Sequence, residues 1–206
     1  MKKILCYGDS NTYGFIPETG ARYSEHERWS GILKKLLSSE FFVIEEGMNN
    51  RTGFFTNPAG LQFSGNKHLP VCIQNYDNID ICILSLGTND SQFFYNLDKN
   101  IAKTGLENLI NILRNKNKEM KIIIIPPVKI TEDILHSGFS VMFNKKSIEI
   151  IREIFPIFEV IAKENNCYYF DFNQLVTPSK TDGLHYTASS HKIIAENLTN
   201  FIRNNI

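Results

Sequence analysis

The sequence predicts a three-layer α/β/α sandwich built around a five-stranded parallel sheet. Short apolar segments rich in Ile and Val recur at wide intervals, as in strands that are buried on both faces. Segments with helical spacing separate them, and a chain that alternates strands with helices folds as a parallel sheet with right-handed crossovers. The predicted strands are residues 4–7, 41–44, 79–86, 122–125 and 168–172.

The first two predicted helices follow from apolar periodicity and capping. Apolar residues repeat at intervals of three and four positions from Trp29 to Leu37, with Lys34 and Lys35 on the other face, which is typical of an amphipathic helix packed on a sheet. Asp98 is suited to cap a second helix that runs to about Asn115.

Two more helices are predicted near the end of the chain. One extends over residues 144–165, and Pro156 inside it predicts a kink, or a break near Phe155. The last helix is expected to begin near Thr187 and end by Arg203, with His191 on its exposed side.

Size and composition exclude several classes of protein. A chain of 206 residues without a Pro-rich, Gly-rich or Ser-rich linker predicts one domain, residues 1–206. With 22 Lys and Arg against 22 Asp and Glu, the net charge of +0 favours neither nucleic acid nor a membrane as a partner. The first apolar run is too short for a signal peptide and no later run spans a bilayer, so we expect a cytoplasmic protein. The 4 cysteines lack Cys-x-x-Cys spacing and are interpreted as reduced core residues.

Four polar loops are expected to meet at one edge of the sheet. In an open parallel sheet, ligands bind in the crevice at the carboxyl ends of the strands. The segments placed there are residues 8–14, 45–53, 87–90 and 182–185.

These loops contain the components of a catalytic triad. Ser10 is the candidate nucleophile, His185 the candidate general base, and Asp182 the carboxylate that orients the imidazole. Each motif also has a simpler interpretation, because Gly-Asp-Ser is an ordinary turn sequence and Asp182 with Gly183 can form a turn.

Asn89 is a candidate donor to an oxyanion, because its amide N–H can stabilise developing negative charge. Gly-Thr-Asn-Asp after a strand is equally compatible with a simple turn. A second, backbone donor is expected from the loop 47–53, in which Arg51 and Thr52 are candidates for bracing the loop.

The ordered set of loops resembles the SGNH or GDSL family of ester hydrolases. The four blocks are Gly8-Asp9-Ser10, the loop around Asn50-Arg51-Thr52, Gly87-Thr88-Asn89-Asp90 and Asp182-Gly183-Leu184-His185. Other segments, such as Arg28-Trp29-Ser30-Gly31, are similar to the bacterial arylesterase and acyltransferase branch, which suggests a homo-oligomer.

The resemblance implies the SGNH hydrolase fold, with a flavodoxin-like sheet, and a set of roles. Ser10, His185 and Asp182 would form the triad, and the N–H of Ser10, the N–H of Asn50 and the side chain of Asn89 would form the oxyanion hole. Asn50 stands where the family has its namesake glycine, which predicts a positive φ or a narrowed pocket. Asn11 replaces the leucine of the GDSL motif, and its side chain faces either the pocket or the next helix.

The predicted function is therefore a serine esterase that acts on a small-molecule ester through an acyl-serine intermediate, without metal or cofactor. The aromatic run Phe93, Phe94 and Tyr95 can wall an acyl pocket or pack against a neighbouring helix or subunit. The apolar segment 131–143 is expected to serve as a lid or an interface. Either role narrows access to Ser10 and favours short acyl groups such as acetyl, with water or an alcohol as the acceptor.

Two other functions fit parts of the pattern. A metal-dependent phosphoesterase would use Asp9, Asp90, Asp182 and His185 to hold cations. A non-enzymatic flavodoxin-like binding module would bind ligands at the acidic loop ends or accept a phosphoryl group on Asp9.

Overall fold

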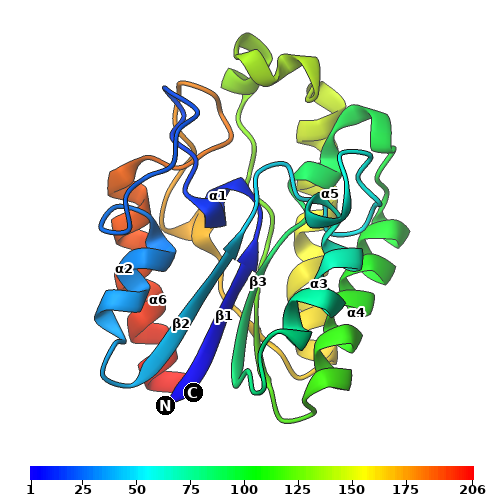
Figure 1. Cartoon of the computed structure of the whole chain (residues 1–206). Coiled ribbons are helices and arrows are strands. Elements are labelled where there is room, and N and C mark those ends of the chain that lie inside the picture. The colour runs from blue at the N-terminus through cyan, green and yellow to red at the C-terminus, as the bar shows by residue number, and fades with distance from the viewer.

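Five parallel strands form one sheet in the order β2-β1-β3-β4-β5 (Figure 1). The computed structural model describes residues 1–206. The strands are β1 (Lys2–Gly8), β2 (Phe41–Gly47), β3 (Ile81–Ser85), β4 (Lys121–Ile125) and β5 (Tyr168–Tyr169). Ile4 of β1 is paired with Val43 on one side and Ile81 on the other. The predicted parallel α/β class is confirmed.

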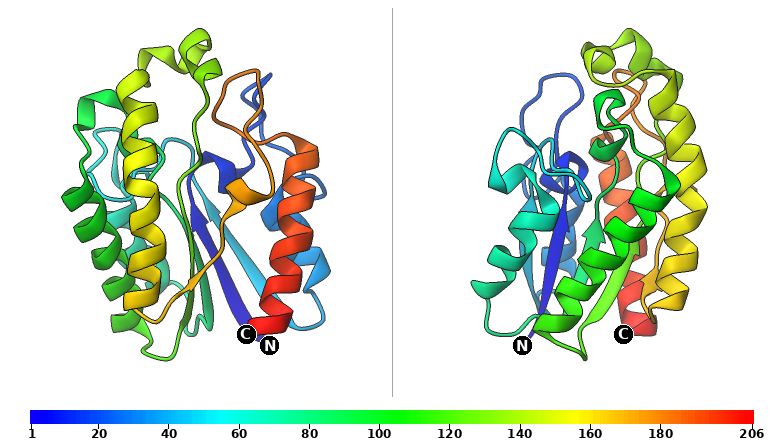
Figure 2. Two further views of the ribbon diagram at one scale, coloured as in Figure 1. Left: turned by 180° about the vertical axis from the view of Figure 1, so that it is seen from behind. Right: turned by 90° about the vertical axis from the view of Figure 1, so that its right-hand side faces the viewer.

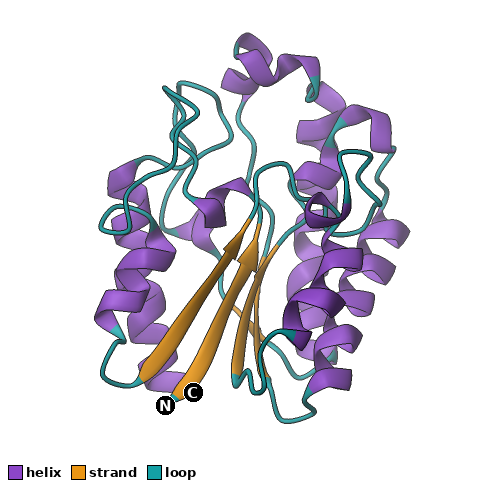
Figure 3. Cartoon of the chain, viewed as in Figure 1, coloured by secondary structure: helices purple, strands orange, loops and turns teal.

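Helices cover both faces of the sheet, as Figure 3 shows by element type and Figure 2 from two further directions. One face carries α2 (Trp29–Leu36) and α6 (Ala188–Asn205). The other carries α3 (Gly65–Gln74), α4 (Lys99–Lys116) and α5 (Lys145–Glu164). Alternate residues of β1 enter the two cores, because Ile4 and Cys6 pack with Trp29 whereas Leu5 and Tyr7 pack with Leu69. No helix is both long enough and apolar enough to span a bilayer.

The structure rules out one of the two alternatives predicted at Pro156, a break in the helix, and corrects the end of β5. Pro156 lies inside α5, which continues without a break. The proline is exposed, so solvent can hydrate the carbonyl that it leaves without an intrahelical donor. β5 ends at Tyr169 instead of Phe172, because Asp171 accepts the N–H of Asn173 and turns the chain into the one-turn helix η6 (Phe172–Gln174).

The prediction that His191 is exposed was wrong. It is fully buried, because it shares one face of α6 with Ile194, Ala195 and Leu198, at spacings of three, four and seven residues. Its Nδ1 atom accepts the backbone N–H of Trp29 at 3.3 Å, while its Nε2 atom has no partner.

The first strand leads directly into a short helix, α1 (Ser10–Tyr13), at the carboxyl edge of the sheet. Here the strand order reverses between β1 and β3, which creates the crevice in which open α/β sheets bind ligands. Gly47 at the end of β2 permits this packing, because a Cβ atom there would lie 2.2 Å from the backbone N of Tyr13.

The segment 131–143 lies above the carboxyl edge of the sheet (Figure 2). It forms two short 3-10 helices, η4 (Glu132–His136) and η5 (Gly138–Val141). Its first residue, Thr131, donates its backbone N–H to the Gly183 carbonyl at 3.0 Å. Gly183 has a φ of 67°, and a Cβ atom there would lie 2.6 Å from the backbone N of Ile134. The segment is therefore packed directly on the loop that contains Asp182 and His185.

Candidate active site

Ser10 is positioned by the junction of β1 and α1. Asp9 caps the helix, since its side chain accepts the N–H of Asn11 at 3.0 Å. Gly14 ends the helix in the left-handed conformation, with a φ of 88°. Ser10 is the first helical residue and is only 6% exposed, so its hydroxyl is held at the carboxyl edge of the sheet.

The three residues predicted to form a triad are hydrogen-bonded in sequence. The distance from Ser10 Oγ to His185 Nε2 is 2.8 Å, and His185 Nδ1 lies 2.6 Å from Asp182 Oδ2. The other oxygen of Asp182 accepts the backbone N–H groups of Leu184 and His185, each at 2.9 Å. These contacts bring together a hydroxyl, a base and an orienting carboxylate.

Asp182 remains an anion in spite of its burial. Burial raises the pKa of this carboxyl, but the hydrogen bonds from the His185 ring and from two backbone N–H groups outweigh it, so the net pKa is lowered. An ionised Asp182 fixes the proton of the imidazole on Nδ1 and leaves Nε2 free to accept a proton from Ser10.

Asn11 faces the His185 loop, which neither of the sequence-based alternatives anticipated. Its Nδ2 atom donates to the carbonyl of Leu184 at 3.2 Å, and its Oδ1 atom accepts the N–H of Tyr186 at 3.0 Å. One buried amide therefore holds the backbone on both sides of His185 and ties it to the residue after Ser10.

The two asparagines predicted to contribute to the oxyanion hole lie on neighbouring loops, after β2 and after β3. Asn50 has a φ of 59°, which confirms the expected left-handed conformation at the position of the family's glycine. Asn89 Nδ2 donates to the Arg51 carbonyl at 3.1 Å and so connects the loop after β3 to the loop after β2.

Two charged residues fix the loop that contains Asn50. The buried Arg51 guanidinium donates to the carbonyls of Gly8 and Gln62, at 3.1 and 2.8 Å. Asp90 accepts the backbone N–H groups of Gly53, Phe54 and Phe55, at 2.6, 2.7 and 3.2 Å. Arg51 therefore braces the loop, and Asp90 is a second brace that the sequence did not indicate.

Comparison with known proteins identifies the family of the chain. Residues 4–198 match the GDSL-like lipase/acylhydrolase family. The chain belongs to this family. No curated protein matches the sequence significantly. Among solved structures, the M. smegmatis aryl esterase has 26% sequence identity and a TM-score of 0.90, and the match covers 100% of both chains. A carbohydrate acetylesterase family member from Sinorhizobium meliloti has 28% identity and a TM-score of 0.88, with 99% of this chain and 98% of that chain covered. This GDSL hydrolase is thus a serine carboxylic ester hydrolase.

Aromatic rings enclose the imidazole of this GDSL hydrolase. The distance between ring centroids is 4.2 Å for Phe15 and His185, and 5.1 Å for Phe139 and His185. Phe139 belongs to the segment 131–143, whereas Phe15 follows α1 and was not singled out in the sequence. Two half-buried phenylalanines therefore pack against the imidazole of His185.

The positions of the three aromatic residues after Asn89 do not favour their role as the wall of an acyl pocket. Phe93 and Phe94 are exposed by 44% and 49%, and Tyr95 stacks on Phe55 of the neighbouring loop with 4.9 Å between ring centroids. The structure thus places two of the three rings on the surface of the GDSL hydrolase.

The acidic residues of the GDSL hydrolase do not form the grouping that a phosphoesterase would need. Asp90 and Asp182 accept several backbone N–H groups each, and Asp9 is a buried helix cap. No group of three or more His, Cys, Asp or Glu side chains is arranged to hold a metal ion. The buried position of Asp9 also gives no support to phosphoryl transfer onto its carboxylate.

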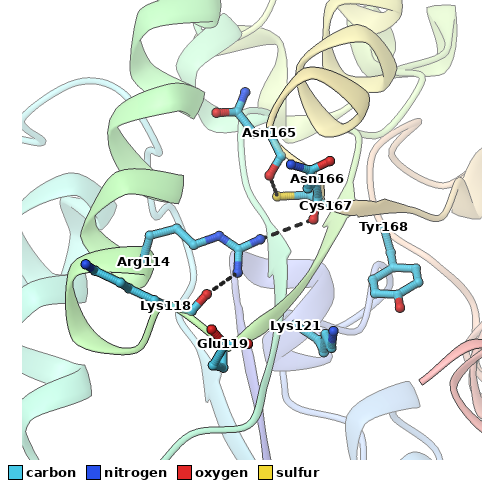
Figure 4. Close-up of a pocket in the computed structure, with 8 residues that line it drawn as sticks. All are labelled: Arg114, Lys118, Glu119, Lys121, Asn165, Asn166, Cys167 and Tyr168. Carbon is cyan, nitrogen blue, oxygen red and sulfur yellow. Dashed lines mark hydrogen bonds between the residues drawn. The ribbon is translucent and has the colours of Figure 1, made fainter.

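A cavity of about 560 Å³ lies elsewhere, at the end of the sheet where β4 begins (Figure 4). Its central cation, Arg114, donates to the carbonyls of Lys118 and Asn166, each at 3.1 Å. Burial raises the pKa of the Cys167 thiol in its wall. This cavity contains no activated nucleophile and lies at the opposite end of the sheet from Ser10.

Proposed function

We propose that Ser10 is the nucleophile in a two-step acyl transfer. As the Ser10 Oγ atom attacks the ester carbonyl carbon, His185 Nε2 removes its proton, and ionised Asp182 stabilises the resulting imidazolium. The observation that carries this proposal is the 2.8 Å contact between Oγ and Nε2, in a residue pair separated by 175 positions. Turn formation alone would not bring these two atoms together.

Three donors would stabilise the oxyanion that forms on the carbonyl oxygen. They are the N–H of Ser10, the N–H of Asn50 and the second Nδ2 hydrogen of Asn89, whose first hydrogen is used by the Arg51 carbonyl. Removing one such donor typically costs about 3 kcal/mol of transition-state stabilisation. The tetrahedral intermediate then collapses as His185 returns its proton to the departing alcohol, leaving an acyl-Ser10 ester.

In the second step the same residues act on an acceptor. His185 takes a proton from water, which attacks the acyl carbon, and Ser10 leaves with the proton that the imidazole returns. An alcohol in place of water gives acyl transfer, which is the alternative suggested by the acyltransferase resemblance.

We propose short acyl groups such as acetyl, on a small-molecule ester, as the substrates. The small exposed fraction of Ser10 and the rings of Phe15 and Phe139 beside His185 support a confined site. The name of one similar structure, a carbohydrate acetylesterase, also supports acetyl as the acyl group.

The test is labelling and replacement of Ser10. A fluorophosphonate should add to Ser10, read by mass spectrometry, and S10A should lose nearly all hydrolysis of p-nitrophenyl acetate while remaining folded. S38A, at an exposed serine, is the matched control and should keep full activity. Wild-type turnover in S10A would remove Ser10 from the mechanism.

Two further proposals concern assembly and compartment. A homo-oligomer would cover exposed apolar side chains such as Phe93, Phe94 and Val141. Analytical ultracentrifugation tests this, and a monomer at all concentrations would contradict it. A cytoplasmic location would keep the 4 free cysteines reduced, and cell fractionation tests that location.

A further inference from the structure

The side chain of Gln92 joins the two asparagines of the predicted oxyanion hole. Gln92 follows the one-turn helix η2 (Asn89–Ser91) and is only 2% exposed. Its Nε2 atom donates to Asn50 Oδ1 at 2.8 Å and to Asn89 Oδ1 at 3.1 Å. Both hydrogens of one buried amide are therefore directed at side-chain oxygens from two different loops.

The direction of these hydrogen bonds is fixed by the backbone. The Arg51 carbonyl can only accept, so the atom of Asn89 that faces it must be Nδ2. The oxygen of Asn89 then faces Gln92, which must present its NH₂ group, and that group requires an acceptor on Asn50. The Arg51 carbonyl thus sets the orientation of three side-chain amides that are hydrogen-bonded in a row, those of Asn89, Gln92 and Asn50.

This orientation matters for the reaction because the two edges of an amide have opposite polarity. With Oδ1 held by Gln92, Asn89 directs an N–H towards the position proposed for the oxyanion. A rotated amide would direct oxygen there and repel the negative charge. On the basis of the proposed function, we infer that Gln92 is a positioning residue of the oxyanion hole, acting through Asn89 and Asn50.

The contact also explains how this chain accommodates Asn50. Glycine has no side chain with which to bind Gln92, whereas Asn50 anchors its left-handed backbone through Oδ1. Asn57 Nδ2 donates to the Asn50 carbonyl at 2.8 Å, so the residue is held at both its side chain and its backbone. The loop that would supply the Asn50 N–H is thereby tied to Asn89.

The experiment compares Q92L and Q92E with the wild-type enzyme. Leucine keeps the volume but removes both donors, and we expect kcat for p-nitrophenyl acetate to fall about tenfold or more, with KM changed less than about threefold. A purely structural residue would instead lower the folded fraction, measured by circular dichroism, and leave kcat per folded enzyme unchanged.

Q92E gives a readout that only a positioning role predicts. The protonated form of the introduced carboxyl can still donate one hydrogen bond, whereas its ionised form repels both Oδ1 atoms. The ratio of mutant to wild-type kcat should therefore fall as the pH is raised. A new negative charge acting only through His185 would raise the pKa of the imidazole and make the ratio rise instead.

Apart from the introduced carboxyl, the charged groups around position 92 are the same in Q92E and in the wild-type enzyme. Asp90 and Arg51 are held by the backbone contacts described above, and Lys146 of α5 lines the same small cavity as Gln92. Q74E, at an exposed position of α3, is the matched control and should show a ratio that does not change with pH.

Double mutants in the N89A and N50G backgrounds test whether Gln92 acts through the two asparagines, and S10A separates this inference from the proposed mechanism. In N89A, whose amide is absent, Q92L should lower kcat by less than about twofold further. In N50G, the loss from Q92L should be smaller than in the wild-type background. If S10A is inactive but Q92L retains kcat within about twofold of wild type, the positioning role is wrong and the mechanism stands. An active S10A would overturn both.

If Q92L fails to fold, the pH dependence of the Q92E ratio decides the question. A ratio that is constant or rises with pH would refute the positioning role.

Discussion

The ring of Phe139 lies against the imidazole of His185, with 5.1 Å between the ring centroids. A side chain of the segment 131–143 therefore reaches the residue proposed as the general base. Thr131, at the start of the segment, is hydrogen-bonded to Gly183 of the same loop. The segment 131–143 and the loop that carries the proposed base are thus one packed unit.

Truncating Phe139 should widen the range of substrates. In F139A the removal of the ring opens space beside His185, so the rate on a C8 nitrophenyl ester should rise about tenfold relative to the C2 ester. The measurement is the ratio of kcat/KM values for the two esters. V141A, in the same segment but 73% exposed, should leave the ratio unchanged. An unchanged ratio in F139A would show that the ring does not limit acyl length.

Replacing Asn11 with the leucine of the GDSL motif should slow the reaction. N11L removes both hydrogen bonds that hold the backbone around His185, and kcat should fall about tenfold with little change in KM. N11D keeps the acceptor for Tyr186 and loses the donor to Leu184, so its loss should be smaller. Steady-state kinetics on p-nitrophenyl acetate test both variants, and full kcat in N11L would contradict the role of Asn11.

Removing the Asp90 carboxylate should destabilise the protein. D90A leaves three buried or half-buried N–H groups without their acceptor, at a cost of about 3 kcal/mol in the free energy of unfolding. D98A removes an exposed cap of α4 and should cost only about 1 kcal/mol. Urea denaturation measures both, and equal losses would argue against the bracing role of Asp90.

His191 should make stability depend on pH. Burial, with a smaller contribution from His185, lowers the pKa of His191 from 6.5 to about 3, so the unfolded chain binds more protons below about pH 6.5. The stability contributed by neutral His191 is therefore present above that pH and lost as the pH falls. Between about pH 7 and about pH 5 the loss is about 2 kcal/mol.

H191N is the matched variant, because its Oδ1 atom can accept the Trp29 N–H without titrating. The quantity to compare is the free energy of unfolding of wild type minus that of H191N between about pH 7 and about pH 5. This difference removes the effect of other titrating groups, including Asp9, whose pKa burial raises to about 7. Parallel stability curves for the two proteins would contradict the prediction.

Most strands and helices were predicted from the sequence, because the signals for strands and helix caps are local. The apolar runs became the five strands, and Asp98 caps α4 through the N–H of Ile101 as expected. The alternation of strands and helices implied a helix between β2 and β3, but the residues of α3 were not assigned, since Pro70 lies inside it and its apolar residues form only a short pattern. Pro156 suggested a kink or a break, and the helix continues through it with Ile154 and Phe158 buried on either side.

The predicted triad came together as a set of hydrogen-bonded side chains, because Ser10 begins α1 just after β1 and the other two residues lie in a loop at the same edge. The supporting residues could not be identified in this way. Gln92 and Asn11 act through partners on other loops, and nothing in their own neighbourhood indicates those partners. Such contacts depend on tertiary packing, which a single sequence does not encode as a short motif.

The long separation between Ser10 and His185 has a consequence for how activity arises during synthesis. Ser10 leaves the ribosome 175 residues ahead of His185, its proposed base, which follows every strand of the sheet and precedes α6. A nascent chain therefore carries the hydroxyl without the means to ionise it. With Ser10 as the nucleophile and His185 as the base, ester cleavage would begin only when translation has passed the last loop and the sheet has closed.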